Sequence, residues 1–198
     1  MDFSRISIYA DGNCFFRCVS SFLNKKLLGS DRFKNGKIKN RELAKTESQA
    51  CMAMRKSVCE KTERNKDKYS NEIYYDGDLY NSIDNRIEKM KSPGEFAGLV
   101  EIKSAAKILK LCFNIYFPVY DTNTGETLRY NLVSKIGKGF HKECNLVLDS
   151  NHYEILIPSS EISPITISKP TTNGKKINRR SIEKSDRVLR EKKKIKYY

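Results

Sequence analysis

The chain has 198 residues with a formal net charge of +14, and 38% of its residues are hydrophobic. This length suffices for one domain with a core, and the low apolar fraction predicts a polar extension beside it. No apolar run approaches the roughly 20 residues of a membrane span, and the first residues lack the apolar stretch of a signal peptide. We therefore exclude a membrane-spanning protein and expect a soluble, cytoplasmic one, with the nucleus left open.

The positive charge is concentrated at the C-terminal end. Residues 169–198 hold 12 Lys and Arg against three acidic residues, a net +9, which leaves +5 for residues 1–168. We expect a globular domain over 1–160 and a basic tail over 161–198. Clustered Lys and Arg can bind nucleic acid or an anionic membrane surface. Because the tail has two aromatic residues and no stacking platform among its charges, we favour a disordered, solvated tail over a nucleic-acid binder.

Amphipathic patterns predict helices in the first half of the chain. Apolar residues recur at three- and four-residue steps in four segments, separated by polar or turn-forming residues. The helices are expected at 14–23, 43–58, 79–90 and 99–109, with exposed loops at 24–40 and 64–78.

β-Branched and aromatic residues mark strands in the second half. The strands are expected at 112–120, 127–133, 146–148 and 153–157, with a hairpin turn at Asp149-Ser150-Asn151 before the last. Because the helices come first and an antiparallel set of strands follows, the predicted fold class is α+β rather than a doubly wound parallel sheet.

The six cysteines indicate neither disulfides nor a zinc ribbon, because no pair has Cys-x-x-Cys spacing and no export signal precedes them. We expect free thiols. Four of them fall within helix or strand patterns, where a cysteine is usually a small buried apolar residue. These are Cys18, Cys51, Cys59 and Cys112.

Cys14 differs from the other cysteines because it follows the turn-forming residues Asp11, Gly12 and Asn13 and opens a helix. Unpaired N–H groups and the positive end of the macrodipole at a helix start favour a thiolate. The same N–H groups can stabilise an oxyanion when that thiolate attacks a carbonyl. Gly12 is expected to keep the backbone small where a substrate approaches.

A thiolate nucleophile needs a base, and the chain has two histidines, His141 and His152. His152 stands at the start of a strand, and side-chain alternation puts Glu154 on the same face, where it could orient the imidazole. His141 lies three residues before Cys144, which would supply two ligands of a metal site, but no further Cys/His pair completes it. We expect no metal and no cofactor.

These residues resemble the ovarian tumour (OTU) family of cysteine deubiquitinases. The segment DGNCFFRCVS at 11–20 is similar to the family's nucleophile motif, and NHYE at 151–154 is similar to its histidine motif. A weaker match is FAGLVEI at 96–102, where the family usually has Trp-Gly-Gly followed by an acidic residue. Phe96 and Ala97 depart from that pattern, whereas Gly98, Glu101 and Ile102 agree with it.

The resemblance implies a papain-like α+β fold, in which a central, mainly antiparallel sheet is flanked by helices. It implies a thiol protease that hydrolyses the isopeptide bond after the C-terminal glycine of ubiquitin, of polyubiquitin or of a ubiquitin-like modifier. Cys14 would be the nucleophile and His152 the base and then the acid. Asp11 would order the oxyanion-hole loop of Gly12 and Asn13. Glu154 stands where the family commonly has Asp or Asn, so whether Glu154 or Asp11 is the third catalytic member stays open.

Recognition of the modifier is expected to involve acidic residues on a polar loop, because the tail of ubiquitin carries arginine near its end. The candidates are Glu72, Asp76 and Asp78, for which a hydrated loop is the competing interpretation. Two other functions stay open: an inactive module that only binds ubiquitin, and a nucleic-acid or anionic-surface binder that acts through the tail.

Overall fold

The computed structural model describes residues 2–24, 33–34, 37–38, 41–71 and 82–161. The chain divides into two compact units, residues 1–163 and 164–198, and the second lies outside the described residues. The fold that follows is that of the first unit. None of its described helices is long and apolar enough to cross a lipid bilayer.

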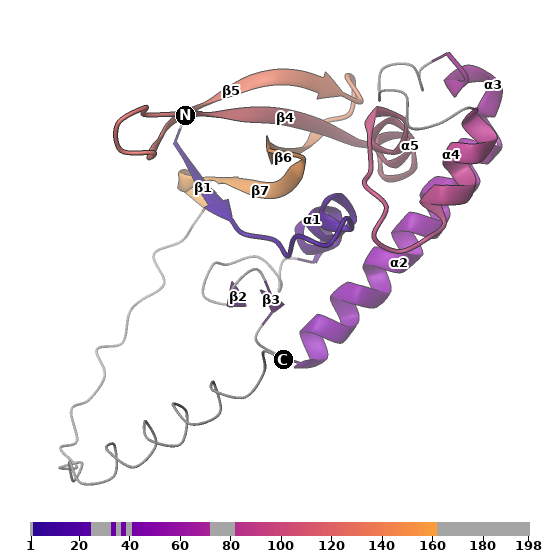
Figure 1. Ribbon diagram of the computed structural model, residues 1–198, viewed down its shortest axis with the longest axis horizontal. Helices are drawn as coiled ribbons and strands as arrows, with labels where there is room; N and C mark the ends of the chain where they lie inside the picture. Colours follow the sequence, from indigo (N-terminus) through magenta and orange to yellow (C-terminus); the bar gives the residue numbers. More distant parts are fainter. Residues whose placement is uncertain (1, 25–32, 35–36, 39–40, 72–81, 162–198) are drawn as a thin grey trace, which may run out of the picture. The chain divides into compact units, whose positions relative to one another are not determined.

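A mixed five-stranded sheet with the order β1-β7-β6-β4-β5 forms the centre of this unit (Figure 1). Its strands are β1 (Phe3–Ile6), β4 (Leu111–Tyr120), β5 (Thr127–Ile136), β6 (Lys142–Asp149) and β7 (His152–Pro158). The pairs β1–β7, β6–β7 and β4–β5 are antiparallel, whereas β4–β6 is parallel. The expected α+β fold with a mainly antiparallel sheet is thereby confirmed.

Three features of the strands were not specified by the sequence. Within the mainly antiparallel sheet, the parallel pair is β4–β6: β5 occupies one edge of β4, and β6 pairs with the other edge and runs parallel to it. The N-terminal strand β1, which the sequence pattern did not reveal, pairs with β7. A short antiparallel pair, β2 (Phe33–Lys34) with β3 (Lys37–Ile38), lies within the predicted loop 24–40.

The helices are α1 (Cys14–Leu23), α2 (Arg41–Glu63), α3 (Lys66–Tyr69), α4 (Ile83–Met90) and α5 (Leu99–Leu109), and a 3-10 turn follows β7 at Ser159–Glu161. Helix α1 packs on β6 and β7, α5 packs on β4, and α2 packs on both helices (Figure 1). Helix α3 falls within the predicted loop 64–78. Residues 79–81, the start of the predicted third helix, lie outside the described residues.

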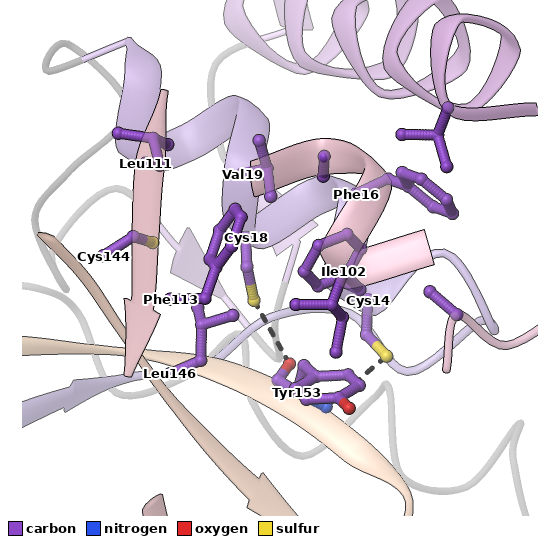
Figure 2. Packing of buried hydrophobic residues seen from close by; sticks show 14 of the residues in the cluster. Cys14, Phe16, Cys18, Val19, Ile102, Leu111, Phe113, Cys144, Leu146 and Tyr153 are labelled. Carbon is purple, nitrogen blue, oxygen red and sulfur yellow. Dashed lines mark hydrogen bonds between the residues drawn. The ribbon is translucent and has the colours of Figure 1, made fainter. Parts of the chain in front are cut away.

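Aromatic rings fix the position of α1 relative to the sheet. The Phe15 ring centroid lies 5.5 Å from that of Phe113 on β4 and 5.7 Å from that of Tyr153 on β7. Figure 2 shows this core, in which Phe113 and Tyr153 lie close to the side chains of α1. Burying each such ring stabilises the fold by about 1.5–3 kcal/mol, so α1 and the start of β7 are held against each other. That packing brings two distant sequence segments together at one site.

The turn between β6 and β7 places the first residue of β7. Asp149 pairs with His152, and the two residues between them, Ser150 (φ 48°) and Asn151 (φ 67°), both have positive φ. Two such residues form the kind of tight turn whose twist matches antiparallel strands. The predicted hairpin turn is confirmed, and it puts His152 at a fixed point of the sheet.

A buried ion pair joins α4 to the start of α5. Arg86 Nη2 lies 2.5 Å from Glu101 Oε2, and both side chains are buried. The same Glu101 carboxylate accepts a hydrogen bond from the Gly98 N–H at 2.8 Å, which satisfies one of the free donors at the helix start. In this chain, Glu101 therefore holds two helices together.

Candidate active site

The loop before Cys14 is shaped by Gly12. Gly12 has φ +70°, and a Cβ on it would lie 1.7 Å from the carbonyl oxygen of Gly94. Only glycine fits this position, because any side chain would meet backbone atoms. We expected the small backbone at Gly12 to let a substrate approach. The structure assigns it to close packing on the turn at Gly94, which supports the nucleophile loop from behind.

Asn13 links this loop to the same turn. Its side-chain Oδ1 accepts hydrogen bonds from the Gly94 N–H at 3.2 Å and from Arg55 Nη2 at 2.7 Å, while Nδ2 donates to the Asp11 carbonyl at 3.3 Å. The Asn13 carbonyl accepts the N–H of Arg17 at 2.9 Å, which begins the first turn of α1. Asn13 is thus both the residue before the helix and the point where three segments meet.

Arg55 on α2 lies beneath the loop and is 1% exposed. Besides Asn13, its guanidinium donates to the carbonyls of Glu95 at 2.8 Å and Met90 at 2.9 Å, and it stacks 4.4 Å from the Phe16 ring centroid. All of these partners are neutral groups. Burial lowers the pKa of Arg55, and nearby ionisable groups act in the opposite direction. A buried cation therefore supports the loop before Cys14.

Asp11 fixes the other side of the loop. Its carboxylate accepts a bifurcated hydrogen bond from Arg17 Nε at 3.1 Å, one from Arg17 Nη2 at 2.6 Å and one from the Asn13 N–H at 3.1 Å. Arg17 also pairs with Glu47 of α2, with Nη1 2.6 Å from Oε2. Burial alone would raise the pKa of Asp11, but the hydrogen bonds and charge of Arg17 and the Asn13 N–H lower it. Asp11 is therefore an anion that orders the loop.

The Cys14 sulfur faces the start of β7. The N–H of Tyr153 donates to Cys14 Sγ at 3.4 Å, and the thiol of Cys18 donates to the Tyr153 carbonyl at 3.4 Å. Figure 2 shows both sulfur atoms directed toward the Tyr153 backbone. The backbone of one β7 residue thus contacts two thiols of α1. Because Tyr153 follows His152, the fold brings the predicted nucleophile and the predicted base to neighbouring positions.

Burial sets the protonation of Cys14. The residue is 1% exposed. The helix start was expected to favour a thiolate, but burial raises the pKa of the thiol above its usual range, and the N–H groups of Tyr153 and Phe15 offset only part of this effect. The expectation from position alone was therefore incomplete, because removal from water disfavours the charged form. A thiolate here requires a partner that takes the proton.

The imidazole of His152 has two distinct nitrogen environments. Nε2 lies 2.9 Å from the Ile8 carbonyl oxygen and 3.7 Å from Glu154 Oε1, and both neighbours are acceptors. Nδ1 is buried and has no hydrogen-bond partner among the described protein atoms. A neutral imidazole donates from one nitrogen and accepts at the other, so this environment favours a proton on Nε2 and a free lone pair on Nδ1.

Glu154 connects the histidine to β1. Its Oε1 accepts the Ile8 N–H at 3.3 Å, and its Oε2 pairs with Arg5. Arg5 also pairs with Asp149 at 3.0 Å. The Ile8 carbonyl, which is closer to Nε2 than the carboxylate is, is held in turn by the Glu154 contact to the same residue. Glu154 is buried beside the histidine, as strand alternation predicts.

The sequence-based candidates fall into three groups in the structure. Cys14 contacts the backbone of Tyr153, the residue after His152, and His152 lies 3.7 Å from Glu154. Asp11, Gly12 and Asn13 form the loop before Cys14. His141 is exposed, and among the described residues no group of three His, Cys, Asp or Glu could hold a metal ion. Glu72, Asp76 and Asp78 lie outside the described residues. All six cysteines are free and buried.

Sequence reasoning missed two contributors, Arg55 and the Ile8 carbonyl. Arg55 lies within a helix rich in charged residues, where a single Arg gives no sign of burial. A backbone carbonyl leaves no mark in a sequence. The available signal for Arg55 was its spacing, because it follows Cys51 by four residues on the buried face of α2.

Comparison with known proteins gives a consistent result. The family model of the OTU-like cysteine protease matches residues 9–155. The fold is similar to the viral OTU domain protease from Dera Ghazi Khan virus, with 20% identity, a TM-score of 0.53, and coverage of 78% of this chain and 80% of that one.

Two other solved structures are similar to the same extent. The OTUD1 OTU domain has 16% identity and a TM-score of 0.53, covering 79% of this chain and 86% of its own. The Hazara virus OTU bound to ubiquitin has 17% identity and a TM-score of 0.53, covering 78% and 80%. At these identities the similarity shows the fold. A search of curated protein sequences gave no match.

Proposed function

Because the chain belongs to the OTU-like cysteine protease family, we propose that it is a deubiquitinase. It would hydrolyse the isopeptide bond after the C-terminal glycine of ubiquitin or of a ubiquitin-like modifier. Cys14 is the proposed nucleophile and His152 the proposed base. The choice of ubiquitin is supported by the similar fold of the Hazara virus OTU, which was solved bound to ubiquitin.

The state of His152 is the observation that supports this proposal most directly. Nε2 is engaged by the Ile8 carbonyl, while Nδ1 is buried without a partner among the described residues. A buried polar atom without a partner costs about 1–3 kcal/mol, so an unused Nδ1 next to the residue that contacts Cys14 Sγ calls for a functional reason. Accepting the Cys14 proton is such a reason.

The proposed reaction follows from this arrangement. His152 Nδ1 takes the proton of the Cys14 thiol, and Sγ attacks the carbonyl carbon of the terminal glycine. The resulting imidazolium returns the proton to the leaving lysine amine as the C–N bond breaks. Water, deprotonated by the same imidazole, then hydrolyses the thioester and releases the modifier's carboxylate. Backbone N–H groups at the loop before Cys14, including that of Cys14, would stabilise the oxyanion.

Glu154 and Asp11 would then have different tasks. Glu154 stabilises the imidazolium through its 3.7 Å approach to Nε2 and holds the Ile8 carbonyl that orients the ring. Asp11 keeps the oxyanion loop in place through Arg17 and the Asn13 N–H. On this basis we propose Glu154, together with the Ile8 carbonyl, as the third member.

The test is reaction of the purified chain with ubiquitin that carries a thiol-reactive warhead at its C-terminus. Mass spectrometry detects the adduct as an increase in mass. We expect one adduct on the wild type, none with Cys14→Ala, and labelling at least about tenfold slower with His152→Ala. Glu154→Gln should react more slowly than wild type but faster than His152→Ala. Warheads of other ubiquitin-like modifiers test the choice of modifier.

Matched controls come from the other thiols and the other histidine. Cys112→Ala removes a different buried cysteine, and His141→Ala removes the exposed histidine; both should label like wild type. If a folded wild type forms no adduct with any of these warheads, the chain is not a deubiquitinase. Binding of unmodified ubiquitin would then favour the inactive module.

A further inference from the structure

Arg5 on β1 joins three other strands of the sheet at the end where β7 begins. Its Nε donates to Glu154 on β7, its Nη2 donates to Asp149 on β6 at 3.0 Å, and its Nη1 donates to the Tyr120 hydroxyl on β4 at 3.3 Å. The Tyr120 hydroxyl donates in turn to Asp149. One guanidinium therefore contacts two carboxylates, and one of them lies beside His152. We call Arg5, Tyr120, Asp149 and Glu154 the arginine cluster.

The register of the sheet puts the arginine cluster on the same face as the histidine. Asp149 is directly opposite His152, and Arg5 is opposite Leu156, which is two residues beyond Glu154. Residues opposite each other share a face, and side chains alternate along a strand. The side chains of Arg5, Asp149 and Glu154 therefore project to the same side of the sheet as the imidazole. The pairing of strands, rather than a loop, sets the place of Arg5.

Hydrogen bonds hold two members of the cluster in their ionised forms. Burial alone would lower the pKa of Arg5, but its hydrogen bonds to Tyr120, Glu154 and Asp149 raise it. The hydrogen bonds of Tyr120 and Arg5 lower the pKa of Asp149 by more than burial raises it. The guanidinium is thus a permanent counter-charge for the Glu154 side chain, which is only 6% exposed.

Glu154 divides its two oxygens between the histidine and the arginine. Oε1 lies 3.7 Å from His152 Nε2 and accepts the Ile8 N–H at 3.3 Å, while Oε2 accepts the hydrogen bond of Arg5. A carboxylate that is buried to this extent is strongly disfavoured when its counter-charge is removed. Without the guanidinium, Glu154 would turn toward solvent to recover its hydration, and Oε1 would leave Nε2.

The position of Arg5 and its charge have opposite effects on the imidazolium of His152. A nearby cation disfavours an imidazolium, so the charge of Arg5 by itself would oppose proton transfer from Cys14. Its position favours that transfer, because it keeps an anion beside the ring. Arg5 contacts Glu154 through the oxygen that does not face Nε2, so the carboxylate is the nearer charge. Interaction energy falls with distance, and the effect of the carboxylate should therefore prevail.

We propose that Arg5 is a positioning residue of the candidate active site: it holds the Glu154 carboxylate against the His152 ring and acts on Cys14 through that carboxylate. The inference rests on the proposed function, because it requires that His152 takes the proton of the Cys14 thiol. Alkylation of Cys14 by iodoacetamide needs no ubiquitin. This reaction therefore tests Arg5 independently of whether ubiquitin is the substrate.

The experiment measures the rate of Cys14 alkylation in the full-length chain at pH 7, by mass spectrometry of the Cys14 peptide. Arg5→Gln should react at least about threefold more slowly than wild type, because the imidazolium loses its stabilising carboxylate. Arg5→Lys keeps the charge but cannot contact both carboxylates and the hydroxyl at once, so its rate should lie between the two. Arg129→Gln removes an exposed arginine from β5 of the same sheet and is the matched control. Its rate should stay within about 1.5-fold of wild type, because solvent screens such a charge.

A double-mutant cycle separates positioning from a general structural role. In the Glu154→Gln background Arg5 has no carboxylate to hold beside the histidine, so adding Arg5→Gln should change the alkylation rate by less than about 1.5-fold. A residue that only keeps the sheet intact would slow alkylation by the same factor in both backgrounds. Thermal unfolding shows which variants are folded. If Arg5→Gln does not fold, Arg5→Lys takes its place in the same cycle.

Three outcomes would overturn the proposal. Wild-type rates in both Arg5 variants would show that the guanidinium does not affect the Cys14 thiol. Faster alkylation of Arg5→Gln would mean that the charge of Arg5, rather than its position, acts on the histidine. An equal loss in both backgrounds would leave Arg5 a structural role alone. Failure of the proposed function is distinguishable from all three, because His152→Ala itself would then be alkylated at the wild-type rate.

Discussion

Arg55 shows how one buried residue can organise a site that it does not touch chemically. Its guanidinium joins the Asn13 side chain of the nucleophile loop to the Glu95 and Met90 carbonyls, and it is 1% exposed. A buried cation whose hydrogen-bond partners are all neutral is expensive to desolvate. The bonds of its two terminal nitrogens must offset that cost, because Nε is buried without a partner among the described residues. A lysine could keep the charge but could not reach all three acceptors at once.

We therefore predict that Arg55→Lys lowers kcat by about 10–100-fold with little change in KM, because a displaced loop misplaces the oxyanion donors without altering the modifier-binding surface. The measurement is steady-state cleavage of a fluorogenic ubiquitin substrate, made below the melting temperature of the variant. Arg64→Lys, an exposed arginine just beyond α2, is the control and should behave like wild type. A rise in KM with kcat unchanged would contradict the proposed role of Arg55 in positioning the loop.

The second prediction at this scale concerns the pH at which Cys14 reacts. Burial raises the pKa of its thiol, so without a proton acceptor the thiolate forms only at a pH above the ordinary cysteine range. In the proposed mechanism, proton transfer to His152 Nδ1 supplies a thiolate near neutral pH. In His152→Ala, Cys14 alkylation by iodoacetamide should therefore be at least about tenfold slower at pH 7 and rise only above roughly pH 8.5.

Mass spectrometry of the Cys14 peptide separates this signal from that of the other thiols. His141→Ala should retain the wild-type profile. A midpoint for His152→Ala at or below that of an ordinary cysteine would show that the helix start, not the histidine, produces the thiolate.

At the scale of elements, the junction between α5 and β4 is strained. Lys110 ends α5 with φ 54° and ψ 44°, a left-handed conformation that costs a non-glycine residue about 1 kcal/mol. Its ammonium lies 5.4 Å from the Phe140 ring centroid, an exposed contact worth about 0.5 kcal/mol. Glycine would remove the strain and lose the contact.

Lys110→Gly should thus raise the free energy of unfolding by about 0.5 kcal/mol, the reverse of the usual effect of a helix-to-glycine change. Urea denaturation measures it. The comparison is Lys45→Gly, an exposed site inside α2, which should lower stability by about 1 kcal/mol. A loss of stability at both positions would mean that the aromatic contact outweighs the strain.

Local patterns predicted most elements, and long-range pairing explains those they missed. Helix α1 begins at Cys14 as expected, and β4 and the β6–β7 hairpin follow their apolar patterns. Strand β1 has too few residues to show a pattern of its own, and it becomes a strand because β7 offers an open edge. The parallel pairing of β4 with β6 depends on which edge β5 occupies, and no local pattern records that choice.

At the scale of the molecule, chemistry-bearing motifs were easier to predict than the residues that support them. Cys14 and His152 stand in distinctive short segments, and the fold brings those segments together through Tyr153. Arg17, Arg55 and the Ile8 carbonyl contribute through contacts that span 30 to 144 residues of sequence. Such contacts follow only from the assembled core, so a sequence can suggest candidate reacting groups while leaving the residues that support them unknown.

The positions of the site residues along the chain also lead to a prediction about the basic tail. The described contacts of the candidate site lie between Arg5 and Glu154, and the first compact unit ends at Ser163. A chain that ends at Ser163 should therefore label with warhead ubiquitin within about twofold of the full-length rate at physiological salt. The tail's charge can still speed encounter with an acidic surface at low ionic strength, because screening over roughly 8 Å removes such steering at 0.15 M salt but not below. Measuring the labelling rate of both chains at two salt concentrations separates these effects. A tenfold lower rate at physiological salt would mean that residues beyond Ser163 contact the modifier directly. A lower rate at low salt alone would limit their contribution to electrostatic attraction.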